Sequence, residues 1–149
     1  MKFQNCLFLI LLIVCLSCQS KKTDKQTGID STLFYTNPVI GGGSEPWAIF
    51  HEGKYYYTQS LADCIILWET DDITQLAEAA KKNVYSPQNA SGISHLWGPE
   101  IHYMDNKWYI YCAADDGNID NRQIYVLENE SPDPMKGEFV MKGRISTDK

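Results

Sequence analysis

Two glutamates and two tryptophans stand close to a pair of prolines in this 149-residue chain. They are Glu45, Trp47, Trp97 and Glu100. Carboxylates accept hydrogen bonds from hydroxyl groups, and an indole face covers the apolar C–H side of a sugar ring at small entropic cost. If the fold brings these four side chains together, they would bind a neutral sugar. His95 is close to Trp97 in sequence and would add a polar contact.

Each of these residues also has a purely structural explanation. Glu45 would be a polar residue at the edge of a sheet, the two tryptophans would pack between layers, and His95 would hydrogen-bond within a loop. Asp115 and Asp116 stand before Gly117, which is typical of a turn, and their spacing does not fit a calcium-binding loop.

The chain contains an internal repeat. The segment PWAIFHEGKYYYTQ, from Pro46, aligns with PEIHYMDNKWYIYC, from Pro99, so the offset is 53 residues (99 minus 46). Each copy has a two-residue connection suited to positive φ, Glu52-Gly53 and Asp105-Asn106, which is a strong β-hairpin signal. A third apolar run follows each hairpin, at 64–70 and at 123–129.

The predicted strands are apolar at nearly every position, as in KYYYTQ and KWYIYCAA. A strand of this kind is covered on both faces, so antiparallel hairpins built from such strands require stacked sheets. A repeat of about fifty residues with about four strands in each copy predicts an all-β fold, a β-propeller whose blades pack face to face around a channel. A β-sandwich with two hairpins that are similar by chance is the alternative.

The repeat also includes elements outside the hairpins. Residues 71–83, DDITQLAEAAKKN, combine helical spacing of apolar residues with Asp72 as a possible N-cap, so we expect one short surface helix in the first blade. Outer strands are expected near 83–85 and at 138–142.

The register of the repeat relates the two glutamates. Aligning Pro46 with Pro99 puts Glu100 in the register of Trp47, two residues from Glu45. Because side chains on a strand repeat every second residue, Glu45 and Glu100 should lean toward the same side. Innermost strands line the channel of a propeller, so we expect both acids at one mouth of it.

The segments SEPWAIFHEGKYYYTQ and HLWGPEIHYMDNKWYIYCAADD resemble the first two blades of the family-43 glycoside hydrolases. These are five-bladed propellers that include α-L-arabinofuranosidases and β-xylosidases. The resemblance covers roughly residues 37–149 and implies inverting hydrolysis of O-glycosidic bonds in arabinose- or xylose-containing polysaccharide fragments. Glu45 stands where the family's general base, typically an Asp before Pro, is found, and Glu100 matches a substrate contact.

The resemblance also implies what these two repeats lack. The family's auxiliary Asp and its general acid belong to the third and fourth blades. Because closed propellers have about four to eight blades, we expect this chain to be the N-terminal part of a longer protein and to be inactive alone. The Glu at the base position leaves a non-catalytic carbohydrate-binding propeller open, and a glycoside phosphorylase would need basic residues in other blades.

An export signal is expected in residues 1–18. An uncharged apolar run from Cys6 to Leu16 is too short to span a bilayer as a stable helix. Ser17 and Cys18 resemble the end of a bacterial lipobox, which predicts lipidation of Cys18 and an envelope lipoprotein facing the periplasm or the cell surface. An ordinary secretory signal is the alternative.

The rest of the chain divides into a polar tether, residues 19–36, and the propeller domain, residues 37–149. The formal net charge of −6 argues against a nucleic-acid partner and suits a neutral one. Contact with a membrane would be through the lipid anchor only. Cys64 and Cys112 lack metal-site spacing and are expected to be buried thiols, and we expect neither a metal nor a cofactor.

Overall fold

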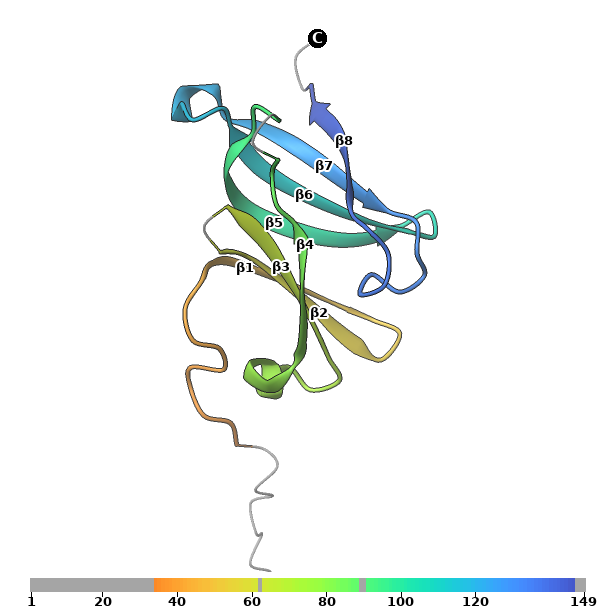
Figure 1. Cartoon of the computed structure of the whole chain (residues 1–149). Helices are drawn as coiled ribbons and strands as arrows, with labels where there is room; N and C mark the ends of the chain where they lie inside the picture. The colour runs from red at the N-terminus through yellow and green to blue at the C-terminus, as the bar shows by residue number, and fades with distance from the viewer. Residues whose placement is uncertain (1–33, 62, 89–90, 147–149) are drawn as a thin grey trace, which may run out of the picture. The chain divides into compact units, whose positions relative to one another are not determined.

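The chain forms two separate four-stranded antiparallel sheets, seen in a computed structural model that describes residues 34–61, 63–88 and 91–146 (Figure 1). The strands of the first sheet, in spatial order, are β1 (Ser44–His51), β2 (Lys54–Leu61), β3 (Cys64–Thr70) and β4 (Ala80–Tyr85). Those of the second sheet are β5 (Ser94–Met104), β6 (Lys107–Asp115), β7 (Gln123–Asn129) and β8 (Val140–Ile145). Each copy of the sequence repeat therefore builds one sheet, as expected of two blades.

The two hairpins predicted from the repeat are confirmed. Their turn residues all have positive φ, at 48° for Glu52, 83° for Gly53, 51° for Asp105 and 60° for Asn106. Positive φ at both central residues defines the turn type whose twist matches that of antiparallel strands. The turns thus fix the register of β1 on β2 and of β5 on β6.

The backbone repeats at two further places, both near the start of the inner strands. Gly42 and His95, which are 53 residues apart, have φ of 78° and 43°. Glu45 and Gly98, also 53 apart, have φ of 55° and 53°, and the strand register shifts around each of them. The internal repeat therefore extends to the backbone conformation at these two positions, with glycine in one copy and His95 or Glu45 in the other.

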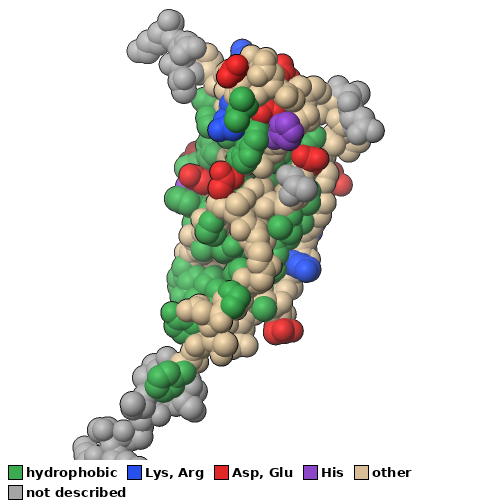
Figure 2. Space-filling model, turned by 90° about the vertical axis from the view of Figure 1, so that its left-hand side faces the viewer, with side chains coloured by type: hydrophobic (Ala, Val, Ile, Leu, Met, Phe, Trp, Pro, Cys, Tyr) green, Lys and Arg blue, Asp and Glu red, His purple; other side chains and the backbone are tan. Residues whose placement is uncertain are grey.

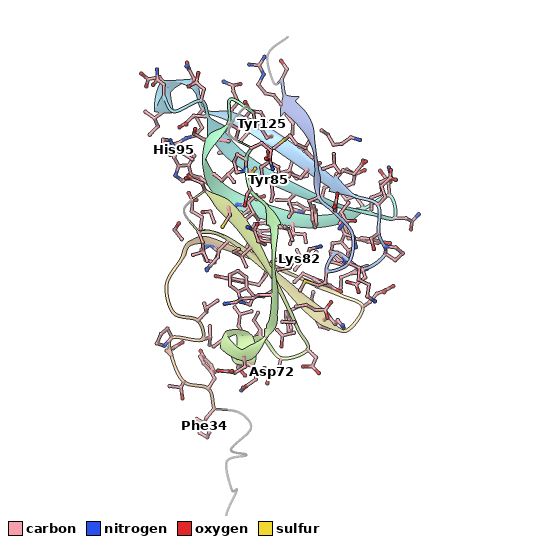
Figure 3. The ribbon with its side chains drawn as sticks, viewed as in Figure 1. Phe34, Asp72, Lys82, Tyr85, His95 and Tyr125 are labelled. Atoms are coloured by element: carbon pink, nitrogen blue, oxygen red, sulfur yellow. The ribbon has the colours of Figure 1, made fainter. Side chains whose placement is uncertain are left out.

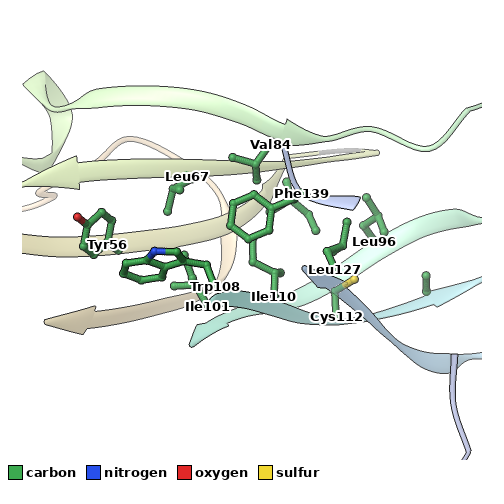
Figure 4. Close-up of a cluster of buried hydrophobic side chains, with 12 residues drawn as sticks. Tyr56, Leu67, Val84, Leu96, Ile101, Trp108, Ile110, Cys112, Leu127 and Phe139 are labelled. Carbon is green, nitrogen blue, oxygen red and sulfur yellow. The ribbon is translucent and has the colours of Figure 1, made fainter. Parts of the chain in front are cut away.

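One buried apolar cluster joins the two sheets (Figure 4). Its members include Tyr56, Ile65, Leu67 and Val84 from the first sheet and Leu96, Ile101, Trp108, Ile110, Cys112 and Leu127 from the second. Trp108 has no exposed surface, and its ring lies 4.7 Å from that of Tyr56 and 4.9 Å from that of Tyr103, measured between centroids. The inward faces of the blades thus cover each other.

Hydrogen bonds across the same contact fix how β1 and β2 of the first blade meet β5 of the second. The Thr58 hydroxyl donates to the Pro99 carbonyl at 2.5 Å, and Trp47 Nε1 donates to the Ile101 carbonyl at 3.0 Å. Both acceptors are on β5. Trp47 is on the inner strand β1 and Thr58 is on its neighbour β2, so these bonds join the first two strands of one blade to the inner strand of the other.

The opposite face of the first sheet has its own small cover. Tyr57, Trp68 and Leu76 form a second buried cluster, against which Ile40 and Ile73 pack. Leu76 and Ile73 come from the short helix η2 (Ile73–Glu78). This confirms that β2 and β3 are buried from both sides.

The predicted helix over residues 71–83 is wrong in its extent. Asp72 does cap the helix, accepting from the Thr74 N–H at 2.9 Å, but η2 is a 3-10 helix that ends at Glu78. Lys81 and Lys82 are in β4, where they pair with Trp68 and Leu67 of β3. Strand pairing with a neighbouring sheet edge has overridden the helical spacing. Both predicted outer strands are present, with the bounds Ala80–Tyr85 and Val140–Ile145 in place of the expected 83–85 and 138–142.

Predictions for the N-terminal residues lie outside the described part of the chain. This applies to the signal in residues 1–18, to lipidation of Cys18 and to most of the tether. Among the residues that the structure describes, no helix has the length and apolar character needed to cross a membrane. Both domain cysteines are free thiols. The expectation of burial is confirmed for Cys112, and burial raises its pKa to about 12, but it is wrong for Cys64, which is partly exposed.

We predict that Trp108→Ala lowers the free energy of unfolding by about 3–5 kcal/mol, because it removes the largest fully buried side chain between the sheets and leaves a cavity. Urea unfolding followed by circular dichroism measures the change. Met104→Ala, at a position 42% exposed near the hairpin turn of the same sheet, is the control and should cost less than about 1 kcal/mol. Equal losses in both variants would contradict the central role of Trp108.

Candidate functional site

Glu45 is the second residue of the inner strand of the first blade, and its side chain reaches the second blade. Its Oε2 accepts a hydrogen bond from the Gly98 N–H at 2.6 Å. The donor is the backbone group at the equivalent position of the repeat, in the bulge before Pro99. The carboxylate is therefore anchored through one oxygen across the junction of the blades, and Oε1 has no hydrogen-bond partner among the described residues.

Glu45 and Glu100 line one hollow of about 390 Å³. The other lining residues are Trp97, Gly98, Tyr111, Cys112, Ala113, Arg122 and Ile124. The Glu100 side chain is 49% exposed, and its Oε2 lies 3.5 Å from Nε2 of His102. Glu45 and Glu100 therefore lie on the same side, as expected from the strand register. On the face shown in Figure 2, acidic side chains lie close to hydrophobic ones and to a histidine near one end.

The two tryptophans have different surroundings. Trp97 lines the hollow beside the acids. Trp47 does not, because its indole lies against β5, with Nε1 on the Ile101 carbonyl and its ring 5.3 Å from that of His102. This placement favours the packing role for Trp47 and leaves Trp97 as the indole next to the glutamates.

Arg122 is a residue of this site that the sequence reasoning missed. Its guanidinium lies 4.1 Å from the centre of the Trp97 ring, a cation–π contact, and it lines the same hollow as Glu45 and Glu100. Arg122 follows a loop that is longer in the second copy of the repeat, so it has no counterpart in the first. In the sequence, the only signal for Arg122 is a basic residue next to an acidic loop.

His95 stands at the start of β5, at the edge of the second blade (Figure 3). Its Nδ1 lies 3.0 Å from Oδ1 of Asp115, the last residue of β6. The same oxygen accepts the Gly117 N–H at 2.8 Å, which confirms a turn-forming role for Asp115. The ring of His95 is 5.4 Å from that of Trp97, so a histidine, an indole and a guanidinium follow one another along this rim.

Asp116 also serves the turn. Its Oδ1 accepts the Asn118 N–H at 3.1 Å, and its Oδ2 accepts from the Asn121 side chain at 2.9 Å. The Asn121 bond and then the Asn118 bond lower the pKa of Asp116. Among the described residues, no group of three or more His, Cys, Asp or Glu side chains is arranged to hold a metal ion.

The comparisons with known proteins agree with this architecture. Residues 35–149 match the family model described as glycosyl hydrolases family 43. The extracellular exo-alpha-(1->5)-L-arabinofuranosidase of Streptomyces avermitilis is 34% identical over 122 residues, which is 78% of this chain and 25% of that protein. Alpha-L-arabinofuranosidase B of Pyricularia oryzae is 30% identical and matches 76% of this chain and 24% of its own length.

Solved structures give the same result. The alpha-L-arabinofuranosidase from Lactobacillus brevis superimposes with a TM-score of 0.69 at 31% identity, covering 76% of this chain and 39% of that one. An endo-arabinase from Bacteroides thetaiotaomicron, at 16% identity and a TM-score of 0.56, shares the fold. The chain thus spans between about a quarter and two fifths of these relatives, and its two sheets match part of their propeller.

We predict that Trp47→Phe lowers the free energy of unfolding by about 1–2 kcal/mol, because it removes the donor to the Ile101 carbonyl and part of the packing between blades. Trp97→Phe, at a partly exposed wall of the hollow, is the matched control and should cost less than about 0.5 kcal/mol. Urea unfolding of both variants tests this. A larger loss for Trp97→Phe would contradict the different roles of the two indoles.

Proposed function

Since this chain is a member of glycosyl hydrolase family 43, we propose that it supplies two blades of a glycosidase of the arabinofuranosidase type. The reaction would be hydrolysis of O-glycosidic bonds in arabinose-containing oligosaccharides or polysaccharide fragments, with xylosides as the second substrate class. The observation that carries the proposal is the hollow in which Glu45 and Glu100 lie beside Trp97. The names of the relatives, which refer to arabinofuranosidases, favour arabinose over xylose.

In this proposal Glu45 is the general base. Its Oε1 would take a proton from a water molecule, whose oxygen forms the new bond to the anomeric carbon as the bond to the leaving oxygen breaks. The leaving oxygen would receive its proton from an acid outside these two blades, as the family resemblance implies. Inverting enzymes hold base and acid about 6.5–9.5 Å apart to leave room for the water. Glu100 and Trp97 would bind the sugar unit that is cleaved off.

The Gly98 anchor supports a fixed position for this carboxylate. A side chain one methylene longer than Asp has an additional rotatable bond, and a displacement of about 1 Å at a catalytic group costs about a hundredfold in rate. The 2.6 Å bond from Gly98 restrains Glu45 at its far end. Glu45 can therefore be as well positioned as a shorter acid would be.

The alternative is a carbohydrate-binding propeller without catalysis. The specific observation in its favour is Glu45 itself, since the resembling family typically has Asp before this proline. Such a protein would use the same hollow and the same contacts from Glu100 and Trp97, but no water would be activated.

We also propose that the protein is exported and held on the membrane by a lipid on Cys18. Two of the relatives carry "extracellular" in their names, which supports export. Cys18→Ser should move the protein from the membrane fraction to the soluble fraction, because attachment depends on burying acyl chains at about 0.8 kcal/mol per methylene. Fractionation of cells and mass spectrometry of the N-terminal peptide measure this. Retention of Cys18→Ser on the membrane would contradict a lipid anchor.

A chimera tests the catalytic proposal. Residues 35–149 would replace the matching segment of the Lactobacillus brevis arabinofuranosidase, which supplies the remaining blades. We expect turnover of an aryl α-L-arabinofuranoside by the chimera and none by the 149-residue chain. Glu45→Gln in the chimera should lower kcat at least about 100-fold, because it removes a general base but keeps an oxygen for Gly98.

Glu78→Gln, an exposed acid at the end of η2, is the control for the chimera and should leave kcat unchanged. Glu45→Asp separates the two functions. If the chimera is active only with Asp at position 45, the natural protein is a binder. If Glu45→Gln is as active as the parent chimera, the assignment of Glu45 as base is wrong.

A further inference from the structure

The proposed base stands on a β-bulge. The register of β1 on β2 shifts between Ser44 and Trp47. Two residues of β1, Glu45 and Pro46, therefore lie opposite one residue of β2, Gln59. A bulge bends its strand and re-aims the side chain that it carries, and bulges are frequent beside active sites. The direction of the Glu45 side chain thus depends on what holds this bulge in place.

Gln59 is a buried polar side chain that lies against the backbone just before the bulge. It is 2% exposed. A Cβ built on Gly43 would have Oε1, Cδ and Nε2 of Gln59 as its nearest neighbours, all closer than 3.0 Å. Gly43 also has a φ of 110°, a conformation that a residue with a side chain rarely adopts. The carboxamide therefore occupies the space that a side chain at position 43 would need, two residues before Glu45.

The carboxamide is itself held by a buried cluster. The Tyr57 hydroxyl donates a hydrogen bond to Gln59 Oε1 at 2.8 Å. The Tyr57 ring packs edge-on against Trp68, with centroids 5.4 Å apart, and both rings belong to the second buried cluster. A series of contacts therefore leads from this cluster through Tyr57 and Gln59 to the backbone that carries Glu45.

The second copy of the repeat builds the equivalent bulge without such a pair. There the bulge lies opposite Cys112, and Leu96 takes the place of Gly43, each 53 residues after its counterpart (112 minus 59 and 96 minus 43). Leu96 and Cys112 are both members of the apolar cluster between the sheets. An apolar pair is thus enough to build the bulge. The glycine and the amide in close contact occur in the copy that carries Glu45.

We propose that Gln59 is the positioning residue for Glu45. By lying against Gly43 it holds the bulge, and the bulge directs the carboxylate to the Gly98 N–H. Gln59 does not line the hollow of the glutamates, so it acts through Glu45 and not on the sugar. Without the carboxamide, the Glu45 side chain would be able to turn away from Gly98. This inference rests on the proposed function, in which Glu45 is the general base.

The first test uses the full chain labelled with ¹⁵N and ¹³C. It measures the scalar coupling across the hydrogen bond between the Gly98 nitrogen and the Glu45 carboxylate carbon. We expect Gln59→Ala to abolish this coupling. Asn129→Ala is the matched control, because Asn129 is a buried amide, 1% exposed, that a Cβ built on Gly137 would meet in the same way. Asn129 lies at the other end of the second sheet, so its variant should keep the coupling.

The second test uses the arabinofuranosidase chimera. Gln59→Ala and Gly43→Ala should each lower kcat at least about tenfold and leave KM within about twofold, since a displacement of about 1 Å at a catalytic group costs about a hundredfold in rate. Both variants break the same contact, so the double variant should lose no more kcat than the worse single variant. Asn129→Ala and Gly137→Ala disturb packing away from the hollow and should leave kcat and KM within about twofold.

Folding of each variant is checked by circular dichroism before the assay. Tyr57→Phe is the milder variant for the case in which Gln59→Ala does not fold. It removes only the hydroxyl that holds the carboxamide and keeps the ring against Trp68. We expect it to weaken the coupling and to lower kcat at least about threefold.

The outcomes separate this inference from the proposed function. An unchanged coupling in Gln59→Ala, or losses of kcat that multiply in the double variant, would overturn the positioning role and leave the proposed function standing. Loss of the coupling without any loss of kcat would instead overturn the proposed function, since the place of Glu45 would then not matter for the reaction. An inactive parent chimera would also overturn the proposed function, and the coupling in the full chain would still decide the role of Gln59.

Discussion

The contact of β1 and β2 with β5 is the constraint on which the rest of the structure depends. Each sheet has strands that are apolar on both faces, so neither would be stable with its inner face open to water. The buried cluster around Trp108 closes this face, and the bonds from Thr58 and Trp47 to carbonyls of β5 set where the strands cross. Everything at the rim, including the acids, takes its position from that crossing.

Two rim positions with positive φ carry side chains that the fold itself does not require. At two equivalent positions the repeat has glycine in one copy and Glu45 or His95 in the other, with the same sign of φ. Glycine adopts this conformation at no steric cost, so glycine in both copies would be compatible with the same backbone. A charged and an imidazole side chain there each make a contact across the site, Glu45 with Gly98 and His95 with Asp115.

Much of the fold was predictable because it follows from local rules. The hairpins depend on two-residue turns, and the stacking depends on strands that are apolar throughout, and both can be read from single segments such as Lys54–Leu61. The prediction of a helix over residues 71–83 failed because Lys81 and Lys82 pair with β3, which is a separate segment of the chain. The spacing of apolar residues carries no information about whether a segment pairs with another strand.

The site was predictable in part for the same reason. Strand periodicity predicts that Glu45 and Glu100 lie on one side, and in the structure they line one hollow. Periodicity cannot distinguish an indole at a rim from one between sheets, so it predicts the same role for Trp47 and Trp97. Arg122 and the Asp115 pairing depend on a loop of the second copy that has no counterpart in the first, so the repeat contained no information about them.

The anchor between Glu45 and Gly98 explains how a longer acid fits this position. The donor belongs to the second blade and lies in a bulge that repeats the bulge of Glu45 itself. A carboxylate one methylene shorter would not reach this donor from the same backbone unless the blades moved closer. The length of the side chain and the separation of the blades are therefore matched, and the position of the carboxylate is set by the packing of two sheets, since Glu45 is part of one inner strand and Gly98 is part of the other.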